Sequence, residues 1–142
     1  MIRNATYNDV LAALARIRAH NIRARIPTRR LDFFLYPSYQ LAYTVNDRLA
    51  ALLVARKWRE GVRVQYVYVF AEHRRKGYAR ALLDALTVAA SKDARPFIAL
   101  HVDVTNIDAI ALYDDAGFKN VQLIENYYRN SDAYRYTKTL KD

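Results

Sequence analysis

The residues from 74 to 79 have the types and the spacing of an anion-binding loop. They stand between an alternating segment, 66–70, and a strongly periodic one, and they read Arg74-Arg75-Lys76-Gly77-Tyr78-Ala79. The first turn of a helix leaves backbone N–H groups unpaired and carries a partial positive charge, and glycine lets a ligand come close. The stretch therefore predicts an anion-binding site, with an ordinary strand–loop–helix turn as the structural alternative.

Composition limits the class of protein. The chain has 142 residues, 53% of them hydrophobic, so we expect one globular domain over residues 1–142. It has no cysteine, which excludes disulfides, thiolate metal sites and a cysteine nucleophile. The histidines at 20, 73 and 101 are too scattered to predict a metal site, and we expect His73 at the surface of a loop.

The formal charge of +9 favours a polyanionic partner. A nucleotide cofactor with several phosphates fits this charge, as does RNA or a ribosome surface, and a solvated basic face is the structural alternative. No apolar run approaches the ~20 residues of a membrane span, and no signal peptide is recognisable. We therefore expect a cytoplasmic protein without a membrane partner, as a monomer or a homodimer.

Hydrophobic periodicity predicts the elements that position these residues. Apolar residues alternate in the expected strands and recur at three and four residues in the expected helices. Strands are expected at 2–6, 39–45, 49–55, 62–70, 97–104, 121–126 and 134–140. Helices are expected after Asn8 or Asp9, over 30–36, after Gly77, and after Thr105 or Asn106. The order predicts an α/β (α+β) fold: a mixed, mostly antiparallel sheet with a central parallel strand–helix–strand crossover and helices on both faces.

Side-chain spacing predicts which faces of the helices are buried. The first helix is expected to bury Val10, Leu11, Leu14 and Ile17, and the helix after Gly77 is expected to bury Leu82, Leu83 and Leu86. Gly117 is expected to end the last helix. Tyr127 and Tyr128 are expected in the loop between the last two strands.

Two motifs, taken with their spacing, resemble those of the GNAT superfamily of N-acetyltransferases. The order R-x-x-G-x-A at Arg74, Gly77 and Ala79 resembles the loop that binds the pyrophosphate of acetyl-coenzyme A. Twenty-nine residues after Gly77, the pattern N-x-x-A-x-x-L-Y-x-x-x-G-F begins at Asn106 and resembles the second signature of that superfamily. The interval leaves room for one helix and one strand. The resemblance implies the GNAT fold over nearly the whole chain.

The resemblance implies acetyl-coenzyme A as the cofactor. The backbone amides of residues 75–79 would surround the pyrophosphate, and Arg74 and Arg75 would add positive charge. The backbone of Val67 and Val69 would pair with the pantetheine arm, as an added strand does. Asn106 would either bond that arm or only cap the helix.

The end of the chain narrows the resemblance to protein N-terminal acetyltransferases. "LHV" before Asn106 and "NYYRNSDAYRYTKTL" are similar to the bacterial ribosomal-protein alanine type and to the eukaryotic type that acts on N-terminal methionine. In the latter type a strand histidine is catalytic, and a tyrosine pair and a Phe-Pro-Val turn enclose the substrate. The resemblance assigns these roles to His101, to Tyr127 and Tyr128, and to Ile26-Pro27-Thr28.

The catalytic residues follow from the resemblance and from the chemistry of acetyl transfer. Such transfer needs an amine that has lost its proton, a polarised thioester carbonyl and a protonated leaving thiolate. Tyr113 stands where the family places the acid for the thiol, with a core aromatic as the alternative. His101 is expected as the general base, directly or through water, with a structural hydrogen bond as the alternative.

The assignment of the base stays open because the chain departs from the family at one position. The family uses a tyrosine on the strand before the phosphate loop, and in this chain the corresponding position holds Arg63. Tyr66 or Tyr68 is a candidate to replace that tyrosine. Asp103 would share a strand face with His101, where it could orient the imidazole or contact a cationic substrate.

The acceptor is expected to be a protein N-terminal α-amine. With a pKa of ~7.7–8.0 against ~10.4 for lysine, it is neutral a few hundred times more often at pH 7, so a weak base suffices for direct transfer in a ternary complex. No carboxylate lies between residues 62 and 70, where a lysine-directed enzyme would hold a glutamate base. Acetylation of lysine, a polyamine or aminoacyl-tRNA remains an alternative, and a non-catalytic acyl-coenzyme A or RNA-binding module is a further one.

Overall fold

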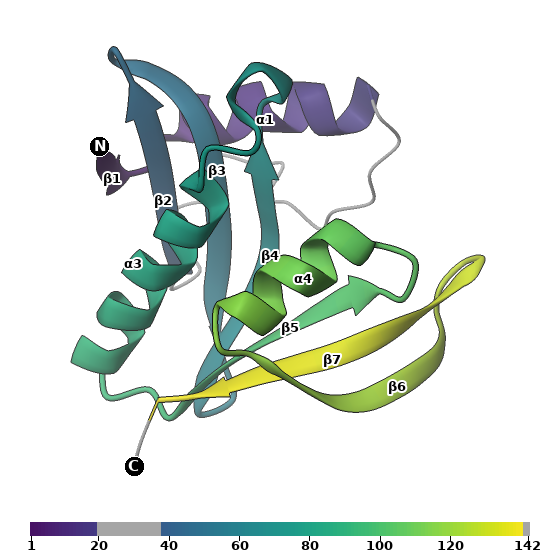
Figure 1. Cartoon of the computed structure of the whole chain (residues 1–142). Helices are drawn as coiled ribbons and strands as arrows, with labels where there is room; N and C mark the ends of the chain where they lie inside the picture. The colour runs from purple at the N-terminus through teal and green to yellow at the C-terminus, as the bar shows by residue number, and fades with distance from the viewer. Residues whose placement is uncertain (20–37, 141–142) are drawn as a thin grey trace.

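The computed structural model describes residues 1–19 and 38–140, in which one seven-stranded sheet carries helices on both faces (Figure 1). The strands are β1 (Ile2–Asn4), β2 (Ser38–Val45), β3 (Arg48–Trp58), β4 (Gly61–Val69), β5 (Phe97–Asp103), β6 (Lys119–Tyr128) and β7 (Ser131–Thr139). The described helices are α1 (Tyr7–Ala19), the short 3-10 turn η1 (Ala71–His73), α3 (Tyr78–Lys92) and α4 (Ile107–Asp115). The helix expected over 30–36 and the turn at Ile26-Pro27-Thr28 lie outside the described residues.

The strand order is β1-β2-β3-β4-β5-β7-β6, and β4 and β5 form the parallel pair. The other described neighbours are antiparallel, so the predicted mixed sheet with a central crossover through α3 is confirmed. A crossover of this kind returns the chain to a parallel neighbour only by way of a helix on one face. The two motifs therefore each follow a strand of this parallel pair, the first after β4 and the second after β5.

The parallel pair is short, and it splits the sheet. In the described chain β4 and β5 pair at Val62 with Ile98 and at Arg63 with Ala99; β4 then continues against β3, and β5 against β7. The register between β3 and β4 shifts where Gln65 is inserted, and such a bulge bends and twists its strand. Figure 1 shows β4 and β5 pointing away from each other beyond this point. The divergence opens the centre of the sheet.

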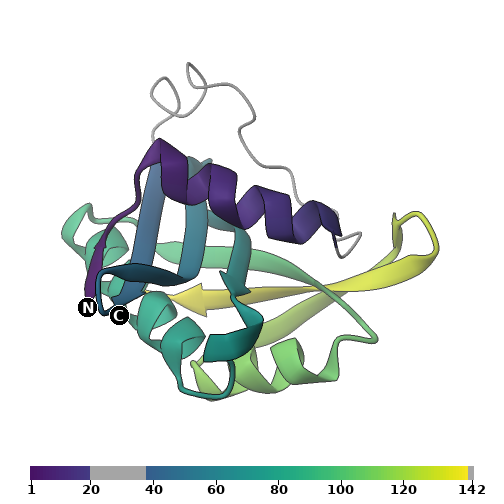
Figure 2. The same cartoon turned by 90° about the horizontal axis from the view of Figure 1, so that it is seen from above.

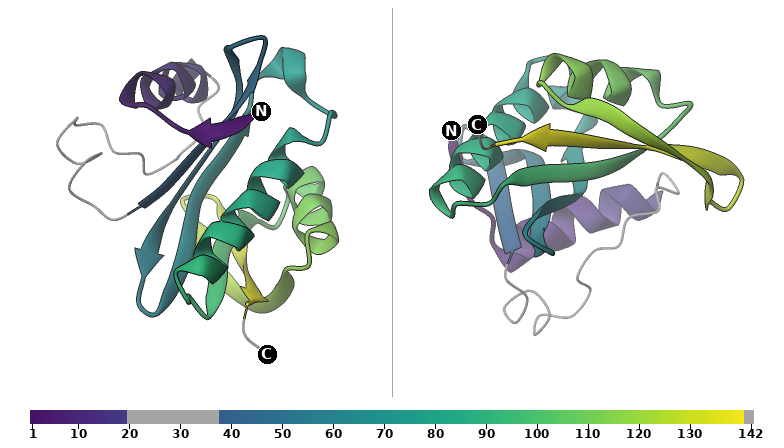
Figure 3. Two further views of the ribbon diagram at one scale, coloured as in Figure 1. Left: turned by 90° about the vertical axis from the view of Figure 1, so that its left-hand side faces the viewer. Right: turned by 90° about the horizontal axis from the view of Figure 1, so that it is seen from below.

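Helices cover the two faces of the sheet unequally. Seen from above, α1 lies on one face, and α3 and α4 lie on the other (Figure 2; Figure 3). The larger core lies between the sheet and α3, where Leu82, Leu83 and Leu86 are fully buried as predicted. On the other face α1 packs against residues of β2, β3 and β4. The prediction of helices on both faces is confirmed.

The start and the buried face of α1 differ from the prediction. Thr6, rather than Asn8 or Asp9, caps the helix: its Oγ1 accepts from the Asp9 amide at 3.2 Å, and the Asp9 carboxylate accepts from the Thr6 amide at 2.7 Å. Such a reciprocal pair satisfies two amides at once, which an isolated cap does not. The buried face consists of Val10, Ala13 and Leu14, whereas Leu11 is 39% exposed.

The tyrosine pair near the end of the chain lies in a strand rather than in a loop. The ladder between β6 and β7 continues to the pair of Tyr128 with Ser131, which leaves the turn to Arg129 and Asn130. Tyrosine favours strands, and after a register shift beyond Ile124 the ladder resumes at Tyr128, so β6 includes both tyrosines. The predicted loop was therefore wrong, although the predicted strand pair is confirmed.

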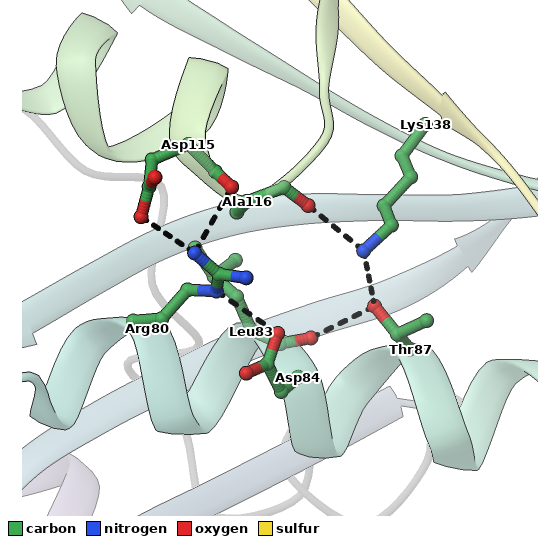
Figure 4. Close-up of polar contacts among 7 residues, drawn as sticks. All are labelled: Arg80, Leu83, Asp84, Thr87, Asp115, Ala116 and Lys138. Atoms are coloured by element: carbon green, nitrogen blue, oxygen red, sulfur yellow. Dashed lines mark hydrogen bonds and ion pairs between the residues drawn. The ribbon is translucent and has the colours of Figure 1, made fainter.

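Polar contacts tie α3 to the end of α4 and to β7 (Figure 4). Arg80 Nη1 donates to the Asp115 carboxylate at 2.6 Å and to its backbone carbonyl at 2.9 Å, while Arg80 Nε donates to Asp84 at 3.1 Å. Lys138 Nζ donates to the Ala116 carbonyl at 2.8 Å. Cations near the last carbonyls of a helix stabilise it, so these contacts fix the position of α4 against α3.

We expect Leu86→Ala to lower the free energy of unfolding by about 2–5 kcal/mol, because the side chain is fully buried between α3 and the sheet. Val88→Ala is the matched control on the same helix, since Val88 is 55% exposed; its effect should stay within about 0.5 kcal/mol. Urea unfolding measures both variants. Equal losses for the two variants would contradict the assignment of the buried face.

No helix in the described ranges has the combination of length and apolar character that crossing a membrane requires.

Candidate functional site

A cleft of about 420 Å³ opens where β4 and β5 diverge. Seven residues singled out from the sequence line it: Tyr66, Val67, His101, Asp103, Asn106, Tyr113 and Tyr128. Its wall also includes Gln65 at the bulge of β4 and the β6–β7 turn at Arg129 and Asn130. The split sheet thus brings together residues that are up to 62 positions apart in the sequence (66 to 128).

The predicted anion loop has the backbone geometry that such a site needs. Gly77 is the N-cap of α3 in the left-handed conformation, with φ of 81°, and Arg75 also has a positive φ, of 63°. The first bond of the helix runs from the Ala81 amide to the Gly77 carbonyl, so the amides of residues 78–80 lie ahead of it. A Cβ placed on Gly77 meets no described atom within 4 Å. Amides in alternating conformations around an open position form a concave site that fits a diphosphate.

The side chains of the loop hold it against the sheet. Arg74 Nε donates to the carbonyl of Val69 at 3.1 Å, which fixes the loop at the end of β4. The Tyr78 ring stacks on Tyr43 at 4.1 Å between centroids, with 20° between their planes. Tyr78 is thus anchored by its ring, and its amide faces the loop with that of Ala79. Arg75 and Lys76 are exposed, where their charge adds to the positive field of the helix end.

One edge of β4 is available beside this loop. Val67 pairs with Leu53 and Val69 with Ala51, both on β3. Beyond Arg63 the opposite edge of β4 has no strand neighbour in the described residues. Such an edge can accept an extended chain by backbone hydrogen bonds.

Tyr113 projects from α4 into the cleft, between the two halves of the sheet. Its ring makes edge contacts with Phe118 and Tyr136, with centroids 6.0 Å and 6.3 Å apart. Burial, and then the neighbouring Tyr128, raise the pKa of Tyr113 to about 12. The phenol therefore keeps its proton at neutral pH, as a proton donor must.

His101 is held by two neighbours on the other wall. Its Nδ1 lies 3.2 Å from Arg63 Nη2, and its ring stacks on Tyr127 at 4.5 Å with 11° between the planes. A guanidinium can only donate, so Nδ1 accepts and the proton of the neutral ring is on Nε2. Arg63 Nη2 also donates to the Tyr127 hydroxyl at 2.6 Å, which joins the three side chains.

The surroundings of His101 disfavour its charged form. Burial, then the charges of Arg63 and Arg135, lower the pKa of His101 from 6.5 to about 4. The imidazole is therefore neutral at pH 7, and it is a weak base.

This pKa shift predicts how stability depends on pH. Between about pH 4 and pH 6.5 the unfolded chain binds a proton at His101 that the native state does not, so the free energy of unfolding falls as the pH falls through that window. In His101→Gln, whose side chain does not titrate, the fall should be smaller. Urea unfolding of both proteins across that window tests this, and parallel pH curves would contradict it.

Asp103 and Asn106 are occupied with local structure. Asp103 Oδ1 accepts from the Thr105 amide at 2.9 Å, from its hydroxyl at 2.8 Å and from Ser131 Oγ at 2.7 Å; the first of these bonds lowers the pKa of Asp103 most. Asn106 caps α4 by accepting from the Ala109 amide at 3.2 Å, which is the capping role that the sequence offered as one of two interpretations. Among the described residues no hydrogen bond joins Asp103 to His101, so the carboxylate fixes the β5–α4 turn.

Sequence reasoning assigned no role to three residues of this site, and two of them gave no signal. Gln65 is a bulge that only the strand register shows, and Arg135 faces His101 across β5 and β7. One observation pointed to Arg63: it stands at the position where the family that the sequence resembles has a tyrosine.

A mixed sheet split at its parallel pair, with an anion-binding helix N-terminus beside the split, defines the fold class of the GNAT acetyltransferases. The model of the acetyltransferase (GNAT) family matches residues 8–118. The chain belongs to this family.

Curated relatives carry N-acetyltransferase names. The chain is 31% identical over 98 residues to the [ribosomal protein bS18]-alanine N-acetyltransferase of Escherichia coli K12, covering 69% of this chain and 65% of the relative. It is 40% identical over 109 residues to an N-alpha-acetyltransferase of Saccharolobus solfataricus, covering 75% and 62%. The chain thus spans less than two thirds of the length of these two relatives.

Solved structures extend the similarity to the whole chain. The crystal structure of the ribosomal-protein-S18-alanine N-acetyltransferase from Escherichia coli aligns with a TM-score of 0.78 at 26% identity, covering 100% of this chain and 94% of that one. Ard1 from Thermoplasma volcanium aligns with a TM-score of 0.88 at 23% identity, covering 100% and 98%, which shows the shared fold.

Proposed function

We propose that this protein is an acetyl-coenzyme A-dependent N-acetyltransferase that acts on the α-amine at a protein N-terminus. The observation that carries the proposal is the cleft that His101 and Tyr113 both line, with the anion loop at the end of β4. The names of the two curated relatives support the same class of acceptor.

The chain has a place for each part of the cofactor. The amides around Gly77 fit the diphosphate, and the available edge of β4 at Val67 and Val69 fits the amides of the pantetheine arm. Asn106 stands beside that path on the wall of the cleft. When bound, acetyl-coenzyme A supplies the thioester whose carbonyl carbon the amine attacks.

The side chains in the cleft suit direct transfer. In direct transfer the amine nitrogen would bond to the carbonyl carbon as the carbon–sulfur bond breaks, and the sulfur would take the proton that Tyr113 holds at Oη. The proton that the nitrogen releases would pass to His101 or to water, and Tyr113 would regain a proton from water. The general-base role of His101 stays a prediction. At a pKa of about 4 its imidazole is unprotonated but weakly basic, so it would accept a proton only from an amine that enters the reaction in its neutral form.

This weak base favours an α-amine over lysine. An α-amine is neutral a few hundred times more often than a lysine side chain at pH 7. Asp103, the carboxylate on the wall of the cleft, is bonded to Thr105 and Ser131 instead. Tyr127 and Tyr128, at the edge of the cleft, would enclose the peptide together with Ile26-Pro27-Thr28. A cytoplasmic location and a monomeric or homodimeric state stay predictions.

A peptide array with varied first residues, supplied with acetyl-coenzyme A, tests the proposal by mass spectrometry. Free N-terminal peptides should gain one acetyl group, whereas N-terminally blocked peptides that contain lysine should not. Equal or faster reaction of lysines or free polyamines would contradict the assignment of the α-amine as the acceptor.

Two further measurements test the alternatives to this function. If acetyl-coenzyme A neither raises the melting temperature of the protein nor is turned over, the proposal that the protein is an enzyme is wrong. RNA binding that weakens steeply with salt would favour the aminoacyl-tRNA alternative.

A further inference from the structure

Two arginines beside His101 have no acidic partner in the described part of the chain. The three ion pairs found there join Arg3 to Asp9, and Arg80 to Asp84 and Asp115, so neither Arg63 nor Arg135 takes part. Half-buried arginines are usually paired, because taking a charge out of water is costly.

Arg63 is oriented by three contacts. Its Nη2 serves both His101 and Tyr127, and its guanidinium lies 5.7 Å from the centre of the Trp58 ring. The described residues provide no hydrogen-bond acceptor for its Nη1 or Nε. A guanidinium held by one nitrogen and an aromatic face presents its remaining N–H groups in fixed directions, where they can donate charge-assisted hydrogen bonds to a carboxylate.

Arg135 approaches the same imidazole from the neighbouring strand. It stands opposite His101 in the ladder of β5 and β7, and its Nε is buried without a hydrogen-bond partner in the described chain. A buried donor of this kind has lost its water partners, which is costly unless a ligand satisfies it. Both arginines thus flank one imidazole, and the charges of both disfavour its protonation.

The two arginines lie on the face of the sheet opposite α3. Val62, Leu100 and Tyr136 belong to the core under α3, so the alternating neighbours Arg63, His101 and Arg135 point to the other face. On that face the core under α1 is formed with residues of β2, β3 and β4 and includes none from β5 or β7. The anion loop belongs to α3, on the opposite face, so these arginines are separate from the phosphate site.

We propose that Arg63 and Arg135 form a subsite for the carboxylate of an acidic side chain within the first three residues of the acceptor peptide. The inference rests on the proposed function, which places the α-amine in the cleft. Arg63 precedes the cleft-lining residue Tyr66 by three positions, about 10 Å along an extended strand, which is the reach of two or three peptide residues. One half-buried pair of guanidiniums suits a single carboxylate, whereas RNA needs a longer exposed basic row.

Matched peptides test the subsite. Peptide pairs that differ only as Asp against Asn at the first, second or third residue are acetylated by the wild-type protein. We expect KM to be at least about tenfold lower for Asp at one of these positions, as for a charge-assisted hydrogen bond. In Arg63→Glu the preference should reverse, so that Lys at that position is favoured over Asp.

Two controls separate local contact from other effects. Arg48→Glu changes the net charge equally but lies in the exposed β2–β3 turn region, so it should keep the preference for Asp. Arg63→Lys keeps the charge, should keep part of the preference, and replaces Arg63→Glu if the latter's melting temperature shows that it does not fold. Equal KM for Asp and Asn peptides at all three positions overturns the subsite and leaves the enzyme intact. Acetylation of no peptide would instead overturn the proposed function, and competition by single-stranded RNA without a peptide preference would assign the arginines to RNA.

Discussion

Tyr113→Phe should lower kcat by about 10²–10⁴, while the dissociation constant of acetyl-coenzyme A changes by less than about threefold. The phenol is the proposed proton donor, which α4 places in the cleft, and its raised pKa keeps it protonated at neutral pH. The ring contacts with Phe118 and Tyr136 remain in the variant, so the shape of the core is unchanged. Single-turnover kinetics and calorimetric titration measure the two quantities.

Tyr134→Phe is the matched control, since Tyr134 is another half-buried tyrosine that packs against the same core from β7. This variant should leave kcat within about twofold of the wild-type value, because Tyr134 does not line the cleft. Unchanged turnover in Tyr113→Phe would remove Tyr113 as the acid. An equal loss in both variants would point to a general packing effect.

Gly77→Asp should weaken the binding of acetyl-coenzyme A by about 100-fold or more. The substitution adds a negative charge where the diphosphate would approach, and at an effective dielectric constant near 20 two such charges repel by about 4 kcal/mol at 4 Å. The open space around the Gly77 Cβ position would then hold a side chain instead of the ligand. Calorimetric titration with acetyl-coenzyme A gives the affinity.

Gly117→Asp is the matched control, because Gly117 is also left-handed, with φ of 90°. Its Cβ would lie 3.8 Å from Lys138 Nζ, so the new carboxylate meets a cation of β7. We expect a similar backbone strain, roughly 1–2 kcal/mol, with unchanged cofactor affinity. Equal loss of affinity in both variants would show that Gly77 acts only through stability.

Local rules were sufficient for the elements that repeat a simple period. The buried face of α3, the cap at Asn106 and the stop at Gly117 follow from spacing and from backbone conformations that few residue types adopt. The predicted cap of α1, Asn8 or Asp9, was two or three residues too late. The side chains of Thr6 and Asp9 each accept from the other's backbone amide, so the cap is the first residue of this pair. The prediction of a loop at Tyr127 and Tyr128 was wrong, because a register shift in β6 is a property of two strands together.

The anion loop was determined by the sequence alone. A strand, a glycine after three cations and a helix N-terminus are contiguous, so local geometry fixes the loop wherever the rest of the chain lies. The same holds for the second motif, because its spacing from Gly77 admits one helix and one strand and thereby predicts the crossover.

Only the tertiary structure decided the state of His101. Arg63 and Arg135 stand 38 positions before it and 34 after it, and they meet it because β4, β5 and β7 are neighbours in the sheet. Charge interactions inside a protein depend on distance in space and on burial, which no local pattern encodes. The sequence therefore determined the backbone geometry of the proposed phosphate site, while the packing of three strands determined how basic the imidazole is and which charges surround it.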